Sequence, residues 1–285
     1  GRAKGSAERQ RIRYELATIY HASLNDPRRA FEFAGDILGE DPSHGAALEI
    51  AQTLGKQPDM QGDFSALLNA LIADIPKGDD RNAVRLTKAR VIAGEGRYEA
   101  ALLELDELPS TKEVLEVRCQ CLRQLQKWTE LANAMEMQVR ADLVPDQSYR
   151  LVLADLYASR LGDLARALGH WATILASSPG VEEAIEGTLF AAEKAEFADA
   201  AYATLIRAAT ARSDWQALVR LLERQRNEAH SPLARSRVNR ELSTVLWTHL
   251  KDEEGSLDAI ERSLDGMEPS TSALRDYVAV HATVR

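Results

Sequence analysis

Apolar residues recur at helical spacing along almost the whole chain. Leu16, Ile19 and Tyr20 fall on one face of a predicted helix, and Phe33 and Ile37 do so in the next. This period of three to four residues is typical of amphipathic helices, and no stretch alternates β-branched and polar residues as a strand would. The pattern therefore predicts an all-α chain of about 16 helices. They lie at about 8–24, 27–39, 44–55, 63–74, 80–94, 98–108, 111–125, 128–142, 146–161, 164–177, 181–195, 198–212, 215–229, 232–250, 253–266 and 271–284.

The breaks between these helices consist of residues that start or end a helix. Asp26 is placed to cap the second helix, and Pro27 follows at the first helical position, where its missing N–H is tolerated. Gly96 and Gly162 follow predicted helix ends, where glycine readily adopts the left-handed conformation. Because the breaks are short, we expect neighbouring helices to form hairpins.

One stretch of the pattern returns without a gap 137 residues later, so that Leu16 to Pro42 matches Leu153 to Pro179. The matching residues are Leu16, Ala17, Ile19, Tyr20, Leu24, Asp26, Ala30, Leu38 and Pro42, and then Leu153, Ala154, Leu156, Tyr157, Leu161, Asp163, Ala167, Leu175 and Pro179. A weaker third copy, shifted by 226, contains Leu242, Val245, Leu250, Asp252, Leu257 and Leu264. Self-similarity over whole helical hairpins indicates a repeat protein.

These residues resemble the tetratricopeptide repeat family, whose unit of about 34 residues is a pair of antiparallel helices. The stretch from Leu16 to Tyr20 fits helix A of such a unit, and Gly96 to Ala101 fits the turn and helix B of another. Trp128 and Trp215 fill the aromatic place at the start of helix B. The resemblance implies a right-handed α-solenoid of seven to eight helical hairpins.

The spacing of the units is irregular. Equivalent helix A positions fall at Leu16, Ile50, Lys88, Arg118 and Leu153, in steps of 34, 38, 30 and 35 residues. The next step, from Leu153 to Leu242, is 89 residues, which corresponds to two units and one surplus helix. We therefore expect regular hairpins over 7–180, an irregular three-helix joint over 181–230, and a last hairpin and helix over 231–285. Residues 1–6 are expected to be a cleavage scar or a disordered start.

Small residues in helix A should let the two helices of a unit approach closely, and large residues should fill the gap to the next unit. The small residues are Ala17, Ala89 and Ala154, with Cys119 and Ser243 in equivalent places. The large residues are Leu38, Leu105 and Leu175. A single hairpin cannot bury its apolar face, but stacked hairpins share a continuous core.

The composition agrees with a helical repeat. Apolar residues make up 45% of 285 residues, and no apolar run approaches the roughly 20 residues that span a bilayer, so no membrane insertion is expected. Cys119 and Cys121 lie two apart in one predicted helix, where a disulfide is geometrically poor, and they are interpreted as half-buried helix cysteines. A reducing compartment is compatible with this, and we expect a cytoplasmic location.

Charge is distributed unevenly over the chain. The net charge of −9 argues against general phosphate-backbone binding, so no nucleic acid partner is expected. The segment 207–240 nevertheless has eight arginines against three acids, a local balance of +5. We call this segment the arginine island.

No catalytic constellation is present in the sequence. The six histidines are scattered without zinc-ligand spacing, and there is no nucleophile elbow or phosphate-cradling glycine loop. Paired acids such as Glu182 and Glu183 lie at predicted helix starts, where they complement the helix dipole. We therefore expect a protein that is not an enzyme and that needs no cofactor and no metal.

The family resemblance implies that exposed residues of the A helices form the inner wall that binds a partner. By that rule the wall contains Arg11, Tyr14, Thr18, His21, Arg90, Glu113, Glu116, Gln120, Arg123, Asp155, Arg237, Arg240, Thr244 and Trp247. Within this set, Arg237 and Arg240 can hold a carboxylate by bidentate hydrogen bonds while Trp247 packs beside it. The sequence thus predicts an adaptor that binds a peptide or helix, acidic in character, in a concave groove, and the reversals Arg237→Glu and Arg240→Glu are expected to abolish capture.

Two other functions remain open at this point. Leu274, Tyr277, Val278 and Val280 form an apolar stripe in the last predicted helix, which suggests either a homo-oligomer or a longer repeat array. RNA binding would rest only on the arginine island, which lacks the interleaved aromatic residues of such proteins. The sequence does not identify the partner.

Overall fold

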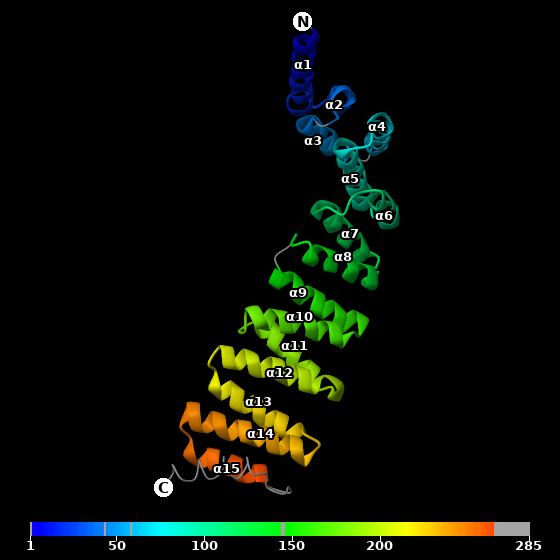
Figure 1. The fold of residues 1–285 in the computed structure, drawn as a ribbon. Coiled ribbons are helices and arrows are strands. Elements are labelled where there is room, and N and C mark those ends of the chain that lie inside the picture. Colours follow the sequence, from blue (N-terminus) through cyan, green and yellow to red (C-terminus); the bar gives the residue numbers. More distant parts are fainter. Residues whose placement is uncertain (1, 43, 58, 144–145, 265–285) are drawn as a thin grey trace. The chain divides into compact units, whose positions relative to one another are not determined.

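The structure, a computed structural model, describes residues 2–42, 44–57, 59–143 and 146–264, with side chains from residue 8 onward. These residues form helices and no strands (Figure 1), which confirms the predicted all-α class. The helices are α1 (Arg2–Ala22), α2 (Pro27–Glu40), α3 (Gly45–Leu54), α4 (Gln61–Asp74), α5 (Asp79–Gly94), α6 (Tyr98–Asp106), α7 (Lys112–Gln124), α8 (Trp128–Arg140), α9 (Asp146–Asp155), α10 (Leu164–Ser177), α11 (Glu182–Ala192), α12 (Ala195–Ala211), α13 (Trp215–Glu228), α14 (Pro232–Val245) and α15 (Glu253–Leu264). Two π-helical segments, η1 (Leu156–Leu161) and η2 (Leu246–Leu250), extend α9 and α14.

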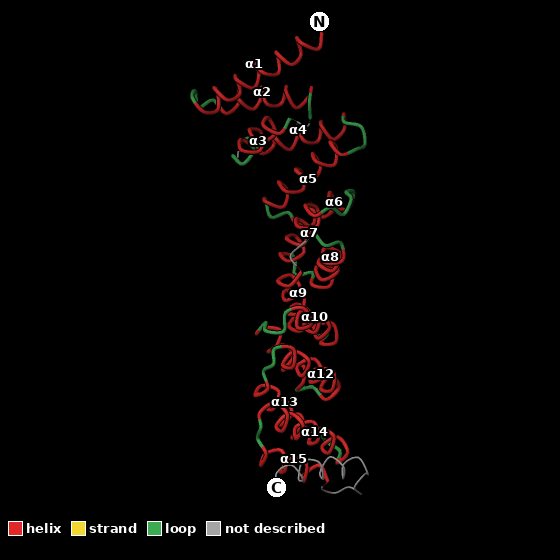
Figure 2. Tube along the Cα trace, turned by 60° about the vertical axis from the view of Figure 1, so that its left-hand side comes forward, coloured by secondary structure: helices red, strands yellow, loops and turns green. Residues whose placement is uncertain are grey.

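The contacts divide the chain into two compact units, residues 1–134 and 135–285, with the boundary inside α8. The repeat spacing predicts divisions near residues 180 and 230 and does not predict this boundary. Those divisions stay a prediction. Its three middle helices are present as α11, α12 and α13. The tube of Figure 2 shows that short loops join consecutive helices within each unit.

The predicted helices match the observed ones closely at most ends. The largest difference is at the start, because α1 begins at Arg2 rather than near residue 8. The predicted helices 146–161 and 232–250 end in η1 and η2. The predicted helix 271–284, and with it the apolar stripe from Leu274 to Val280, lies outside the described residues.

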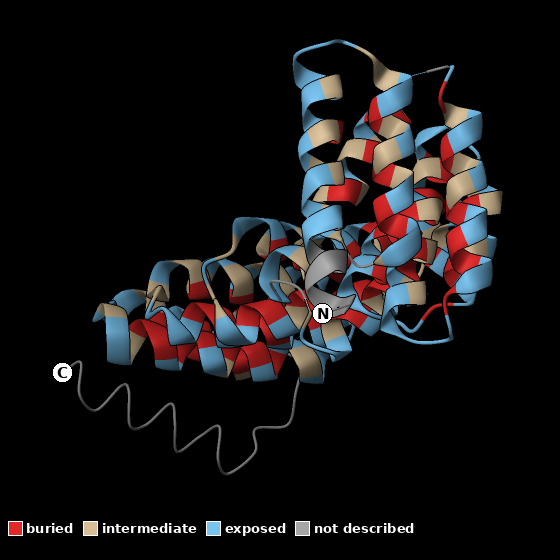
Figure 3. Ribbon diagram, turned by 90° about the horizontal axis from the view of Figure 1, so that it is seen from above, coloured by how far each residue is buried: buried red, intermediate tan, exposed pale blue. Residues whose placement is uncertain are grey.

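Small residues mark the places where helices approach most closely, as the sequence predicts. Ala17, Ala89 and Ala154 have no exposed surface, and Cys119 is almost completely buried. Ser243 is also buried, and its hydroxyl lies 2.9 Å from that of Ser256 on α15, so the polar group in this small place is hydrogen-bonded. Figure 3 shows buried positions, in red, recurring along the helices of each unit.

Large side chains fill the spaces between hairpins. Leu38 and Leu105 are fully buried in unit 1, and Leu175 is buried in unit 2. Cys121 is also fully buried, so the prediction of two half-buried cysteines was wrong; Cys121 belongs to a core cluster that α7 shares with α5 and α6. Burial raises the pKa of the Cys121 thiol, which makes it a weaker nucleophile near neutral pH.

The turn of the first hairpin is held by a small cluster of side chains. The Asp26 carboxylate accepts a hydrogen bond from the Arg29 amide at 3.2 Å and so caps α2. The Arg29 guanidinium lies over the Tyr20 ring, 5.5 Å from its centroid, and donates to the Tyr20 hydroxyl at 3.3 Å. Phe33 stacks on Tyr20, with 5.6 Å between the two ring centroids.

The hairpin 137 residues later repeats these contacts. Asp163 accepts from the Arg166 amide at 3.0 Å, and Arg166 lies 5.4 Å from the Tyr157 ring centroid and donates to its hydroxyl at 3.3 Å. His170 takes the place of the first hairpin's phenylalanine and stacks on Tyr157 at 5.7 Å. The repeat in the sequence therefore extends to individual side-chain contacts.

The third copy, in the α14–α15 hairpin, keeps the cap and loses the ring cluster. Asp252 accepts from the Gly255 amide at 2.9 Å, so the cap is present. Leu246 and Ala259 stand where the first two copies have the tyrosine and the second ring. This loss explains why the third copy is weaker in the sequence.

All three turns share an unusually wide backbone geometry. The amide of the capping aspartate bonds to a carbonyl six residues earlier, at 3.0 Å for Asp26, 2.9 Å for Asp163 and 3.1 Å for Asp252. The residue before each aspartate has positive φ, and Lys251 is one of these residues. Other hairpins close with a bond across five residues, as from Arg97 to Ile92 at 3.1 Å. The turns of the three copies are therefore one residue longer than the other turns. Because all three have the same length, their sequences match without a gap.

Replacement of Ala154 by leucine should destabilise unit 2, because α9 has no space for a larger side chain at this position. We expect a loss of about 1–3 kcal/mol in the free energy of unfolding, measured by urea denaturation. Ala165→Leu on the exposed face of α10 is the control and should change stability by less than about 0.5 kcal/mol. Equal stability of the two variants would contradict the close approach at this position.

His170 should make the protein less stable in acid. Burial lowers the pKa of its imidazole, although Glu136, 3.1 Å away, opposes the shift. The folded state binds the proton on His170 less well than the unfolded state does. The contribution of His170 to the free energy of unfolding is therefore fully present above the ordinary histidine pKa of about 6.5 and is lost as the pH falls below it.

His170→Phe reproduces the ring that the first hairpin carries at this position and removes the titrating group. Its melting temperature should fall less than that of the wild type between about pH 7.5 and pH 5.5, while replacement of the exposed His230 by phenylalanine should leave the wild-type slope. If the two variants had the same slope, the assignment to His170 would be wrong.

Candidate binding grooves

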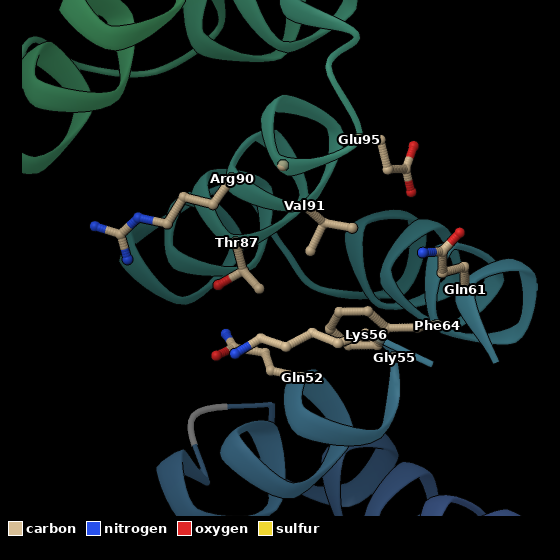
Figure 4. Close-up of a pocket in the computed structure, with 10 residues that line it drawn as sticks. Gln52, Gly55, Lys56, Gln61, Phe64, Thr87, Arg90, Val91 and Glu95 are labelled. Carbon is tan, nitrogen blue, oxygen red and sulfur yellow. The ribbon is translucent and has the colours of Figure 1, made fainter. Parts of the chain in front are cut away.

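A hollow of about 350 Å³ in unit 1 lies between α3, α4 and α5 (Figure 4). Phe64 of α4 forms its floor and is 1% exposed. In the figure, Thr87 and Val91 of α5 face Phe64 and Lys56 across the hollow, and Arg90 extends outward from α5. Thus α3 and α5, which have the helix A place in their repeats, form the walls, and α4 between them forms the base.

A glycine allows this floor to form. A Cβ atom on Gly55 would lie 2.5 Å from a ring carbon of Phe64, so any larger residue would push the ring out of place. In unit 2, a Cβ on Gly187 of α11 would lie 2.2 Å from the Trp171 ring, away from the groove described below. Both glycines let the backbone pack directly on an aromatic side chain.

The charges around the hollow of unit 1 favour an anion. Lys56 and Arg90 line it, and its one lining acid, Glu95, pairs with Arg97 at 3.2 Å. The excess of cations stands out because the whole chain has a net charge of −9. Arg90 was predicted from the sequence as an inner-wall residue, and the structure places it at this hollow.

A second groove, of about 270 Å³, lies in unit 2 between α11, α12 and α13. Its surface is formed by apolar side chains from all three helices. They include Ile185, Leu189, Leu205, Ala208, Ala217 and Leu221. We call this surface the α11–α13 groove. As in unit 1, two helices form the walls and the helix between them forms the base.

Three arginines from the arginine island line the α11–α13 groove, and no acid lines it among the described residues. Arg212 pairs with Asp214 at 3.3 Å. Arg224 pairs with Glu193 at 3.4 Å and with Glu228 at 3.0 Å. Arg220 is exposed and has no ion-pair partner within the described part of the chain. It is therefore available to a ligand without breaking an existing pair.

A hydrogen-bonded acid positions one of these arginines. The Tyr202 hydroxyl donates to Glu228 at 2.6 Å, and Glu228 in turn accepts from Arg224. Burial, reinforced by Glu228, raises the pKa of Tyr202 well above its ordinary value. Burial alone would raise the pKa of Glu228, but the bonds from Tyr202 and Arg224 outweigh it and lower the pKa. Glu228 therefore stays ionised and keeps Arg224 beside the groove.

The second wall helix of each groove is lined by residues at the same spacing. On α5 the lining residues Thr87, Arg90, Val91 and Gly94 follow the helical steps of three, four and seven. On α13 the lining residues Ala217, Arg220, Leu221 and Arg224 follow the same steps. Each groove thus has an arginine at the second position of this spacing, although α5 is a helix A of the repeat and α13 begins with the helix B residue Trp215.

Arg220 was missed in the sequence analysis because Trp215 marks its helix as a helix B within the irregular three-helix joint. The inner-wall rule covers the exposed residues of the A helices only. The signal that could have found it is the combination of the arginine island with the helical spacing from Ala217 to Arg224.

The other predicted wall residues are spread over several helices. In α1, Arg11 pairs with the neighbouring Glu15 at 3.0 Å, His21 is exposed, and Tyr14 is half-buried with its ring 5.7 Å from that of His44. Glu116 and Arg123 are exposed on α7. No contact brings these residues together in one site among the described residues, and their part in binding stays a prediction.

The three residues singled out near the C-terminus lie on α14 and η2. Arg237 is exposed, Arg240 is half-buried, and Trp247 is half-buried. The Arg240 Nε atom has no hydrogen-bond partner among the described residues. None of the three lines the α11–α13 groove, and their role in binding stays a prediction.

Among the described residues, no group of three or more histidine, cysteine, aspartate or glutamate side chains is arranged to hold a metal ion. Within the same ranges, no helix has the length and apolar character required to cross a bilayer.

No family model and no curated protein matches the chain. Among solved structures, a tetratricopeptide repeat protein from Parabacteroides merdae is similar at 12% identity, with 95% of this chain and 98% of that chain covered and a TM-score of 0.39. A chain of the Naa15/Naa10 structure bound to HypK-THB is similar at 14% identity and a TM-score of 0.45, covering 96% of this chain and 45% of that chain. PilW, a type IV pilus biogenesis factor, is similar at 15% identity and a TM-score of 0.37, covering 83% and 98%. The helices and hairpins of this chain establish its all-α fold. This fold resembles that of tetratricopeptide repeat proteins.

Proposed function

We propose that the protein is a non-catalytic scaffold that binds a short segment of a partner protein in the α11–α13 groove. The observation that carries the proposal is an apolar groove lined by three arginines and by no acid, in a chain of net charge −9. Such a surface complements a segment that has apolar side chains flanked by carboxylates.

The size of the groove limits what can occupy it. A hollow of about 270 Å³ holds one or two large apolar side chains rather than a folded domain. Burial of one leucine or phenylalanine side chain contributes about 1.5–3 kcal/mol. An amphipathic helix that presents such residues at spacings of three and four fits a groove between parallel walls.

The arginines supply orientation and specificity. A guanidinium group holds a carboxylate by two parallel hydrogen bonds, which a lysine cannot do. Arg220 forms no ion pair with a described residue that a ligand would have to break, and Arg224 is held at the groove by Glu228 and Tyr202. Carboxylates on the partner should therefore meet Arg220 first.

The charge reversal Arg220→Glu should abolish selection of acidic segments. Selection of a displayed random peptide library on the wild-type protein should enrich peptides in which leucine or phenylalanine is flanked by aspartate or glutamate. For a synthetic peptide of this kind, Arg220→Glu should weaken binding by about tenfold or more in fluorescence anisotropy, because two charged hydrogen bonds are lost.

Three variants make this test specific. Arg28→Glu, an exposed site on α2, changes the net charge equally and should bind like the wild type. Ala217→Trp fills the groove without changing charge and should also weaken binding. Arg237→Glu tests the arginines singled out from the sequence. Loss of binding in Arg237→Glu with full binding in Arg220→Glu would transfer the site to α14 and overturn the proposal.

A further inference from the structure

A separate hollow in unit 2 gathers arginines from three helices. It has a volume of about 530 Å³ and lies where α13 ends and α14 begins, beside α15. Arg226, Arg235 and Arg262 each come from a different one of these helices, and Asn239 and Pro232 complete the wall. None of these residues lines the α11–α13 groove. We call this hollow the arginine hollow.

The arginine hollow has an unbalanced positive charge. No acid lines it among the described residues. Arg262 has a partner outside the lining, Asp258, at 2.9 Å, while Arg226 donates to the neutral side chain of Asn227 at 3.4 Å and has no ion pair in the described part of the chain. Arg235 is exposed and has no ion-pair partner within the described ranges. Like charges around one hollow repel each other, and a bound anion would remove this repulsion.

The start of α14 adds to the positive potential. Pro232, its first residue, is part of the wall, and so are Arg235 and Asn239 further along this helix. The Ser231 hydroxyl accepts from the Ala234 amide at 3.1 Å and satisfies one of the free amides at this end. The partial positive charge of the helix start favours an anion here, in addition to the arginines.

Asn239 indicates that the ligand also carries a hydrogen-bond donor. It is 4% exposed, it lies one helical turn from Arg235 on the same face of α14, and it lines the hollow. Its Oδ1 atom has no hydrogen-bond partner among the described residues. Buried acceptors are normally paired, so a group that brings an O–H would complete this site.

We propose that the arginine hollow binds a phosphoryl group. Its oxygens would accept hydrogen bonds from Arg226, Arg235 and Arg262, in the bidentate geometry that guanidinium groups favour. A phosphate monoester has a second pKa of about 6 and keeps one proton on part of its molecules near neutral pH. That O–H can donate to Asn239, which neither sulfate nor an ionised carboxylate can do. Both free phosphate and a phosphorylated side chain have this chemistry.

The experiment is a calorimetric titration of the whole protein at about pH 6.5, where the phosphate monoester carries a proton in part of the population. Inorganic phosphate and O-phosphoserine are the two probes, and sulfate is the comparison anion. Tighter binding of O-phosphoserine identifies a phosphorylated side chain as the natural ligand, and equal binding identifies free phosphate. Absence of binding by both probes would overturn the proposal.

Two arginines on the same helix provide a matched pair of variants. Arg235→Gln should weaken phosphate binding by about tenfold, because it removes charged hydrogen bonds to the anion. Arg237→Gln, two residues further along α14 and outside the hollow, should bind like the wild type. Equal weakening in both variants would mean general attraction to positive charge, which overturns the site. If Arg235→Gln fails to give a wild-type circular dichroism spectrum, Arg226→Gln replaces it with the same expectation.

A third variant tests the role of the amide. Asn239→Ala should reduce phosphate binding to the level of sulfate and leave sulfate binding unchanged, since only the donor from phosphate uses Oδ1. Equal loss for both anions would contradict the proposed recognition of the proton. Arg220→Glu should leave phosphate binding unchanged, which separates the arginine hollow from the groove on α11–α13.

Discussion

The close approach of helices at alanine positions is the constraint on which the structure depends. Ala17, Ala89 and Ala154 have no exposed surface, and each lies in the first helix of a hairpin where any larger side chain would separate the two helices. A hairpin alone cannot bury its apolar face, so its stability comes from the next helix stacked on it. The grooves are consequences of this stacking, because each consists of two wall helices held against a common base.

Glycine allows close packing on an aromatic ring in each unit. Gly55 lets Phe64 close the floor of the hollow in unit 1, and Gly187 lets α11 pack on Trp171 in unit 2, away from the α11–α13 groove. In both grooves the apolar surface is fixed by helix packing, so specificity is left to the charges beside it. Both grooves have an excess of cations in an acidic protein, which is the physical reason for proposing an acidic partner.

Most of the fold could be predicted from the sequence because its determinants are local. Asp26 and Asp163 cap their helices as their position before a helix start predicted, and Gly96 and Gly162 have the positive φ expected of them. Helical spacing located the helices because one apolar face recurs in each. Even the weakness of the third copy is visible in the sequence, where leucine replaces the tyrosine that binds arginine in the other two.

The candidate sites were harder to predict because their residues meet only through packing. The α11–α13 groove joins residues of three helices, and the part of its lining that comes from α13 is set by the packing of these helices on one another. The arginine island gave the right segment, but the helix phase that sends Arg220 to the groove and Arg226 to the arginine hollow depends on three-dimensional contacts. The stacking of Trp215 on His249, at 3.5 Å between ring centroids, likewise joins residues that no local pattern connects.

The central claim, that the α11–α13 groove is the binding surface, is tested most directly by methyl NMR of leucine-labelled protein during titration with an acidic, apolar peptide. The account predicts that Leu189, Leu205 and Leu221, which line the groove, shift at the lowest peptide concentrations. Leu103 and Leu233, which are 71% and 65% exposed elsewhere, should stay unchanged. Shifts at Leu103 or Leu233 without shifts at the three groove leucines would contradict it.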